Sequence, residues 1–445
     1  AFANSCAQPS RGIFAAPSNS EDCLYLNVFM PHGSDAAAKL PVMVWFYGGG
    51  LFSGESNDYD GSKLAQRGHV IVVTLNFRVG ALGFLSVPSL NNEGHPHVNY
   101  GIMDQQAALR WVKQNIASFG GDAGNVTIFG QSGGGTAVMA NLQSPTAKGL
   151  FHRAINESGT HITVVTPEAE LKAGEAFAKQ AGCPDAAAAC LRNLSIRQIF
   201  EHQAPVVHLV TEFPSADGTI ITDDAPHAYR TGNFNHVPIL TGLVQDEQSF
   251  FMPETQRGAP PLTADGYEKF LGSMGAAHKV ALAQKYPMSK YESPSLAEIA
   301  VAQNFKACTA HLLDDDWTKY VPVFAYEFRD RTAPSYYPPT SFPMRAYHTA
   351  ELLYLFPLFH GGQGTPHPLN AKQEKLSDLL VDYWTSFARN GVPTAKSGDL
   401  SSDAWTTYSA QSENIQYLEL TGGHQHPGYG QMHDCSFWQD ILPYK

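Results

Sequence analysis

The chain has 445 residues, of which 43% are hydrophobic and 16% charged, a balance typical of a folded globular protein. Its formal net charge of −12 at pH 7 argues against nucleic acids and anionic membranes as partners. No apolar run approaches the roughly 18 residues that a membrane-spanning helix needs, so we expect no membrane span.

Short apolar runs alternate with longer helical patterns over the first two thirds of the chain. This alternation predicts an α/β fold with a mostly parallel central sheet flanked by helices on both faces. The predicted strands, in chain order, cover residues 24–29, 41–46, 70–75, 125–129, 153–156, 237–241 and 321–328. The predicted helices cover residues 104–119, 133–142, 166–180 and 369–389, with further helical segments within 264–313.

A serine lies between a predicted strand and a predicted helix in the sequence Gly130-Gln131-Ser132-Gly133-Gly134. Glycine two positions to each side is typical of a nucleophile elbow, because side chains there would clash with neighbouring backbone. The turn exposes the hydroxyl at a helix N-terminus, where amides and the helix dipole favour negative charge. The pattern predicts Ser132 as a nucleophile. The alternative is an idle serine in a glycine-rich turn, which the position between strand and helix disfavours.

A second glycine run, Tyr47-Gly48-Gly49-Gly50, follows the predicted strand at 41–46. Acyl transfer needs preorganised N–H donors around the developing oxyanion, and consecutive glycines let amides turn toward one point. We expect Gly49, Gly50 and Gly133 to supply these donors. A phosphate-binding loop is the alternative, but no lysine followed by Ser or Thr completes that motif.

An acid and then a histidine should follow the serine along the chain. Candidate acids come directly after the strand predicted at 237–241, at Asp246 and Glu247. The pattern alone does not choose among the downstream histidines. These are His278, His311, His348, His360, His367, His424, His426 and His433.

The six cysteines form no C-x-x-C motif, which argues against zinc ribbons and thioredoxin-like chemistry. An even count with two locally spaced pairs favours disulfides and an oxidising compartment. The alternative is six buried free thiols in a cytosolic enzyme, because six cysteines allow roughly 15 pairings. The cysteines are Cys6, Cys23, Cys183, Cys190, Cys308 and Cys435.

Six segments, in order along the chain, resemble the type-B carboxylesterase/lipase family, which includes cholinesterases and bacterial nitrobenzyl esterases. They are SEDCLYLNVF (20–29), VWFYGGG (44–50), GNVTIFGQSGG (124–134), FHRAINESG (151–159), DEQSFF (246–251) and HTAELLYLF (348–356). On these segments the chain is identified as a member of the family, of the bacterial or fungal secreted esterase type. The resemblance implies an α/β-hydrolase fold.

The resemblance also implies site residues and disulfides. Glu247, rather than Asp246, matches the triad acid, His348 matches the base, and Ser158 matches a position that hydrogen-bonds the acid. The implied disulfides are Cys6–Cys23, Cys183–Cys190 and Cys308–Cys435. Such bonds fit a secreted or periplasmic enzyme whose signal peptide has been removed, since residues 1–3 lack a basic start and an apolar core.

We expect a single catalytic domain over residues 1–445, with helical insertions at about 160–235 and 252–318. The small N-terminal sheet of the family is expected to be absent, and with it one wall of the pocket. No metal or cofactor is expected. His424 and His426 resemble a metal-binding pair, but no third ligand accompanies them and a solvent loop is the predicted environment.

Two departures from the family bear on the substrate. Gln131 replaces the usual Glu before the nucleophile, which weakens attraction for cations. No tryptophan for cation–π binding of choline lies between Cys6 and Cys23, where Phe14 is the only aromatic residue. The predicted function is therefore hydrolysis of small, uncharged carboxylic esters, aryl or of short to medium acyl length, through an acyl-enzyme.

Segments around Phe52 and residues 209–213, 250–252 and 336–342 are predicted to line the acyl and alcohol pockets, because they are rich in aromatic side chains. Two other functions stay open. One is a noncatalytic adhesion or binding member of the same family, which would have lost part of the triad. The other is an amidase, lactonase or thioesterase that uses the same triad.

Overall fold

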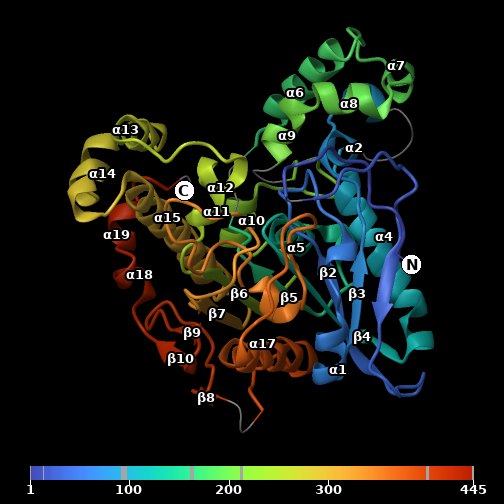
Figure 1. Ribbon diagram of the computed structural model, residues 1–445. Helices are drawn as coiled ribbons and strands as arrows, with labels where there is room; N and C mark the ends of the chain where they lie inside the picture. The colour runs from blue at the N-terminus through green and yellow to red at the C-terminus, as the bar shows by residue number, and fades with distance from the viewer. Residues whose placement is uncertain are drawn as a thin grey trace.

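A mostly parallel sheet forms the centre of the molecule (Figure 1). The computed structural model describes residues 2–13, 15–91, 98–160, 165–210, 214–396 and 400–442. Across this part of the chain the strand order is β1-β3-β2-β4-β5-β6-β7-β9-β10-β8. The strands are β1 (Leu26–Phe29), β2 (Leu40–Phe46), β3 (Ile71–Leu75), β4 (Gly121–Gln131), β5 (Arg153–Glu157), β6 (Ile239–Val244), β7 (Val323–Phe328), β8 (Ser401–Ser402), β9 (Ile415–Glu419) and β10 (Gly422–His426).

The strands from β3 through β9 in this order all run parallel, whereas β1 is antiparallel to β3 and β10 is antiparallel to β9. The strands β2 (LPVMVWF) and β3 (IVVTL) are almost entirely apolar and every residue of both is buried, as expected for a parallel sheet covered on both faces. The predicted α/β class and all seven predicted strands are confirmed, with ends shifted by a few residues.

The sequence did not predict the strands β8, β9 and β10. His424 and His426 were expected in a solvent loop, and this expectation is wrong, because both lie on β10 paired with β9. The His426 ring stacks on Tyr417 of β9 with 4.1 Å between centroids. The segment GGHQH of β10 carries no β-branched residue, so its strand conformation comes from pairing with β9 rather than from its own propensity.

Two groups of helices pack against the sheet. The first is α17 (Ala371–Asn390), which contacts β2, β4, β9 and β10, together with α1 (Ser62–Gly68) and α16 (Leu352–Leu355), which pack on α17. The second is α5 (Gly133–Gln143) on β2, β4 and β5, α4 (Tyr100–Asn115) beside α5, and α15 (Pro294–Trp317) on β6 and β7, with α10 (Ala225–Thr231) between α5 and α15.

The remaining helices form smaller groups around the sheet. Helices α6 (Pro167–Gln180), α7 (Ala188–Arg192), α8 (Ile196–His202) and α9 (Ala204–Val210) project from the sheet beside α2 (Gly80–Phe84), as Figure 1 shows at its upper right. The others are α3 (Pro88–Asn91), α11 (Gln248–Phe251), α12 (Pro253–Arg257), α13 (Ala264–Ser273), α14 (Lys279–Lys285), α18 (Tyr429–Met432) and α19 (Cys435–Trp438). The division into one domain with two insertions stays a prediction; α15, inside the second predicted insertion, packs directly on the sheet.

Three disulfides join all six cysteines in the pairs that the family resemblance implied: Cys6–Cys23, Cys183–Cys190 and Cys308–Cys435. The last pair spans 127 residues and ties α15 to α19, so it restricts the unfolded chain more than the two short loops do. Among the described residues, no helix has both the length and the apolar character needed to cross a bilayer.

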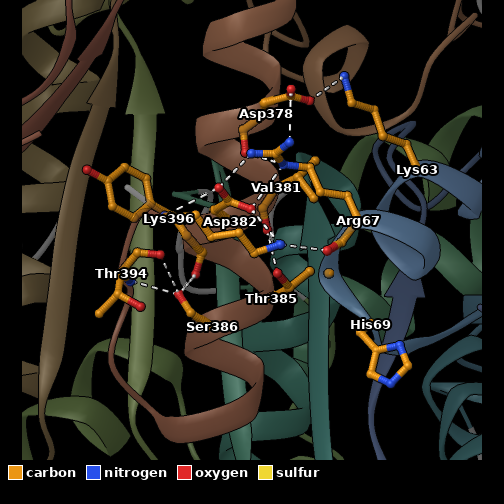
Figure 2. Close-up of polar contacts among 12 residues, drawn as sticks. Lys63, Arg67, His69, Asp378, Val381, Asp382, Thr385, Ser386, Thr394 and Lys396 are labelled. Atoms are coloured by element: carbon orange, nitrogen blue, oxygen red, sulfur yellow. Dashed lines mark hydrogen bonds and ion pairs between the residues drawn. The ribbon is translucent and has the colours of Figure 1, made fainter. Parts of the chain in front are cut away.

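An ion-pair network fixes α1 against α17 (Figure 2). Arg67 donates to both carboxylate oxygens of Asp382, at 3.0 and 2.8 Å, and lies 3.0 Å from Asp378. Lys396 lies 3.4 Å from Asp382, whose side chain is only 3% exposed. A carboxylate so deeply buried needs such partners to remain charged.

We expect Asp382→Ala to lower the free energy of unfolding by about 3 kcal/mol, because it leaves the Arg67 guanidinium without its bidentate partner. Urea denaturation followed by circular dichroism measures this. Glu374→Gln is the control: Glu374 pairs with Lys63 at 2.9 Å but is 55% exposed, so its loss should cost less than about 1 kcal/mol. Equal losses in the two variants would contradict the assignment.

Candidate active site

The turn between β4 and α5 holds Ser132 in a strained backbone conformation, with φ 58° and ψ −123°. Neighbouring backbone leaves no room for side chains on either side of it. A Cβ at Gly130 would lie 2.5 Å from the carbonyl oxygen of Gly134, and a Cβ at Gly134 would lie 1.9 Å from that of Phe46. The Ser132 N–H donates to the carbonyl of Glu157 on β5 at 2.8 Å, which anchors the turn to the sheet.

The glycine run after β2 lies directly against this turn. A Cβ at Gly133 would lie 2.6 Å from the amide nitrogen of Gly50 and 2.8 Å from that of Leu51. Gly49 and Gly50 both have positive φ, 114° and 62°, which a residue with a side chain rarely adopts. Within the described part of the chain, no hydrogen bond takes the N–H of Gly49 or Gly50. The predicted oxyanion donors are thus brought together, with two amides still available.

His348 and Glu247 meet although 101 residues separate them in the chain. Glu247 follows β6 and begins α11, and both side chains are almost fully buried. The His348 Nδ1 and a Glu247 carboxylate oxygen form a short hydrogen bond. The other oxygen accepts from the Ser158 hydroxyl at 2.6 Å and from the Val244 N–H at 3.2 Å.

Burial alone would raise the pKa of Glu247, but the charge and hydrogen bond of His348, the ammonium of Lys306 and the Ser158 hydroxyl lower it to about 2. Glu247 is therefore a carboxylate at neutral pH and accepts the proton on Nδ1. This fixes the tautomer that leaves Nε2 as an acceptor.

The neighbouring acid, Asp246, points elsewhere. Its two oxygens accept from Arg331 at 2.6 and 2.9 Å, and Arg345 lies 3.8 Å away. Asp246 is thus a buried carboxylate that pairs with the partly exposed Arg331, and of the two adjacent acids only Glu247 contacts His348.

Ser132 and His348 line the same pocket of about 660 Å³, together with Gly49, Gly50 and Gly133. The His348 ring packs beside Phe251 with 4.7 Å between centroids. Its Nε2, the ring atom that would accept the proton of Ser132, lies 3.3 Å from the side-chain amide nitrogen of Gln131.

The aromatic pocket walls predicted from the sequence are partly correct. Phe52, Phe250 and Phe251 line the pocket, whereas Met252 and residues 336–342 do not. The Tyr337 ring packs against Phe250, with 5.4 Å between centroids, and its hydroxyl accepts from Gln256, another residue of the pocket lining. Leu209 lines a separate small cavity near Phe84. Residues 211–213 and Phe14 lie outside the described residues.

Two residues of α15 support the acid and were not predicted. Gln303 accepts the Glu247 N–H at 3.0 Å and donates to the Val244 carbonyl at 3.3 Å. One turn further on, Lys306 places its ammonium 3.8 Å from the Phe251 ring centroid, and burial lowers the pKa of this lysine to about 8. No motif marks either residue; only the packing of α15 on β6 gives them this role.

Two further buried carboxyls lie behind the turn. Burial raises the pKa of Glu157 to about 8, although Trp384 donates to one of its oxygens at 2.9 Å. Burial also raises the pKa of Glu351, and the charges of Glu157 and Glu247 raise it further. Among the described residues no donor reaches either Glu351 oxygen. Burial thus favours the protonated form of both acids, whereas the partners of Glu247 favour its ionised form.

A model of the carboxylesterase family matches residues 1–438. Para-nitrobenzyl esterase of Bacillus subtilis (strain 168) is 33% identical over 439 residues, covering 94% of this chain and 84% of that protein. A medium-chain fatty acyl-CoA hydrolase precursor of Anas platyrhynchos is 34% identical over 405 residues, covering 85% and 69%. A solved structure of PNB esterase superimposes with a TM-score of 0.78 at 29% identity, covering 98% of this chain and 88% of that one.

The pKa of Glu157 makes stability depend on pH. Between its ordinary pKa of 4.5 and the raised pKa of about 8, the unfolded chain ionises this carboxyl while the folded chain keeps it protonated, so stability falls as pH rises through this window and levels off above it. Glu157→Gln removes the penalty and keeps an oxygen for Trp384. We expect it to be more stable than the parent by on the order of 3 kcal/mol at the top of the window and equal below it.

Thermal or urea unfolding across the pH range measures this difference. Glu175→Gln, at an exposed position of α6, serves as the control and should follow the parent curve. Parallel curves for Glu157→Gln and the parent would show that Glu157 is ionised in the fold.

Proposed function

The chain belongs to the carboxylesterase family, and we propose that it hydrolyses carboxylic esters with a catalytic triad of Ser132, Glu247 and His348. The observation that carries this assignment is the hydrogen-bonded pair of His348 and Glu247, which makes Nε2 the proton-accepting nitrogen of a ring that lines the same pocket as Ser132. Relatives named as esterases, with 30% identity or more, support the same reaction.

In the proposed mechanism Ser132 Oγ attacks the ester carbonyl while His348 Nε2 takes its proton. Glu247 keeps the ring in the required tautomer and stabilises the imidazolium that forms. The amides of Gly49, Gly50 and Gly133 bind the oxyanion, each contributing on the order of 3 kcal/mol to the barrier reduction. His348 then protonates the leaving alcohol, and water repeats the sequence on the acyl-enzyme. Ser158 positions the acid through the 2.6 Å hydrogen bond to Glu247.

We propose aryl esters or esters of short to medium acyl length as substrates, because Phe52, Phe250 and Phe251 line a pocket of moderate volume. Gln131, neutral and beside His348, offers no attraction to a cationic group. A second candidate is thioester hydrolysis, favoured by the relative named as a fatty acyl-CoA hydrolase. Matched ester and thioester substrates separate the two activities.

We propose a secreted or periplasmic location for the enzyme. Three disulfides, one of them between segments far apart in sequence, support an oxidising compartment during folding.

Ser132→Ala should lower kcat for a p-nitrophenyl ester by about 10⁴-fold or more, because no other group at the turn replaces the nucleophile. It should also abolish covalent labelling by an organophosphate, detected as a mass shift on the peptide that contains the turn. Ser158→Ala is the matched control and should still be labelled, since its hydroxyl faces Glu247. Retained labelling of Ser132→Ala would show that another residue is the nucleophile.

The two adjacent acids give a second test. Glu247→Gln should lower kcat/KM by about 10³–10⁴-fold, because the wrong tautomer and an unstabilised imidazolium result. Asp246→Asn weakens the pair with Arg331 and should lower the melting temperature while activity changes by less than about tenfold. If Asp246→Asn loses more activity than Glu247→Gln while remaining folded, the acid is misassigned.

A further inference from the structure

The candidate pocket carries two arginines. Arg11 comes from the segment between Cys6 and Cys23, and Arg257 is the last residue of α12. Among the residues that the structure describes, no aspartate or glutamate lines this pocket. A cavity with two cationic side chains is unexpected in a chain whose formal net charge is −12, so it calls for a functional explanation.

Arg11 is held close to the proposed oxyanion amides. Its guanidinium carbon lies 3.5 Å from the centroid of the Phe52 ring, a cation–π contact. The Phe52 ring in turn covers Gly50, since a Cβ on Gly50 would lie 2.5 Å from the ring. One aromatic ring therefore separates the Arg11 charge from the loop that would bind the oxyanion.

The segment that carries Arg11 is anchored on both sides. Upstream, the Cys6–Cys23 disulfide closes the loop that contains it. Downstream, Gln363 donates its side-chain amide to the Gly12 carbonyl at 3.0 Å and its backbone N–H to the Ile13 carbonyl at 3.0 Å. The backbone that carries the Arg11 guanidinium is therefore held in place by the fold.

Neither arginine is neutralised within the protein. In the described part of the chain, Arg11 and Arg257 take part in no ion pair. Glu254, on the same short helix as Arg257, accepts from Ser341 instead. Since exposed charges are screened beyond about 8 Å at physiological salt, the acidic remainder of the surface does not cancel these two cations inside the pocket.

We propose that Arg11 and Arg257 select esters that carry a carboxylate away from the scissile bond. Both side chains are exposed to solvent and line the pocket, and the guanidinium fork matches a carboxylate bidentately. Gln131 fits the same selection, because a glutamate there would repel the anion. This inference rests on the proposed esterase function, and it revises the expectation of uncharged substrates.

The test compares rigid, matched substrates whose carboxylate cannot attack its own ester. On the acyl side these are p-nitrophenyl 4-carboxybenzoate, its neutral 4-carbamoyl isostere and the cationic 4-trimethylammonio analogue. On the alcohol side they are 4-acetoxybenzoate and 4-acetoxybenzamide. For at least one side kcat/KM should be about tenfold higher for the anion than for the amide, and the cation should be the poorest substrate.

Arg11→Met and Arg257→Met keep the apolar stem and remove the charge. Each should lower kcat/KM for the anionic ester by about tenfold, mainly through KM, while the amide isostere changes by less than about twofold. Arg11→Lys should retain part of the preference, because the charge remains while the bidentate fork is lost. Arg197→Met, at an 83% exposed side chain on α8, is the control and should change neither substrate.

The outcomes separate this inference from the function on which it rests. Hydrolysis that depends on Ser132 but shows equal kcat/KM for anion and amide on both sides overturns the arginine selection and leaves the esterase assignment intact. A preference that persists in both methionine variants also overturns it. If none of the matched esters is hydrolysed by the parent enzyme, the proposed function itself fails.

Discussion

The close approach of two backbone turns is the constraint on which the site depends. The turn after β4 and the glycine run after β2 touch with almost no space between them: a single added carbon at Gly133 would lie 2.6 Å from the amide nitrogen of Gly50. β2 and β4 are adjacent parallel strands, so their carboxyl ends meet at the same edge of the sheet. Because both turns are built from glycines, the strained Ser132 and the amides of the glycine run can point into the same pocket.

The buried glutamates differ in pKa because they have different hydrogen-bond and charge partners. Glu247 has a histidine, a hydroxyl and a backbone N–H around it, and its pKa is lowered to about 2. Glu157 has one indole donor and its pKa is raised to about 8. Both are buried glutamates, so the donors and charges that the surrounding elements supply decide whether the pKa is lowered or raised. In the proposed mechanism, the ionised Glu247 beside His348 is the carboxylate that stabilises the imidazolium.

The charge inside the pocket is set independently of the charge of the whole chain. The backbone turns and the proposed triad come from the ends of sheet strands and the loops that follow them, whereas Arg11 and Arg257 come from the disulfide-closed segment near the N-terminus and from α12. The same scaffold can therefore keep one reaction while its peripheral segments change the charge that the substrate meets.

The sequence by itself determined the parts of this protein that depend on local patterning. Continuous apolar runs identified the parallel strands, and glycine at fixed offsets around Ser132 identified the elbow, because strand burial and tight turns restrict residue type position by position. His348 and Glu247 needed the resemblance to a family, since nothing local distinguishes them from seven other histidines or from Asp246.

Only the tertiary structure decided what depends on contacts between distant segments. It paired β10 with β9 against weak local propensity, and it turned Asp246 toward Arg331 and Glu247 toward His348. It also placed Lys306 near Glu247, and Arg11 over Phe52. A side chain's partners, burial and pKa come from elements far away in sequence, and no pattern of spacing along one segment contains that information.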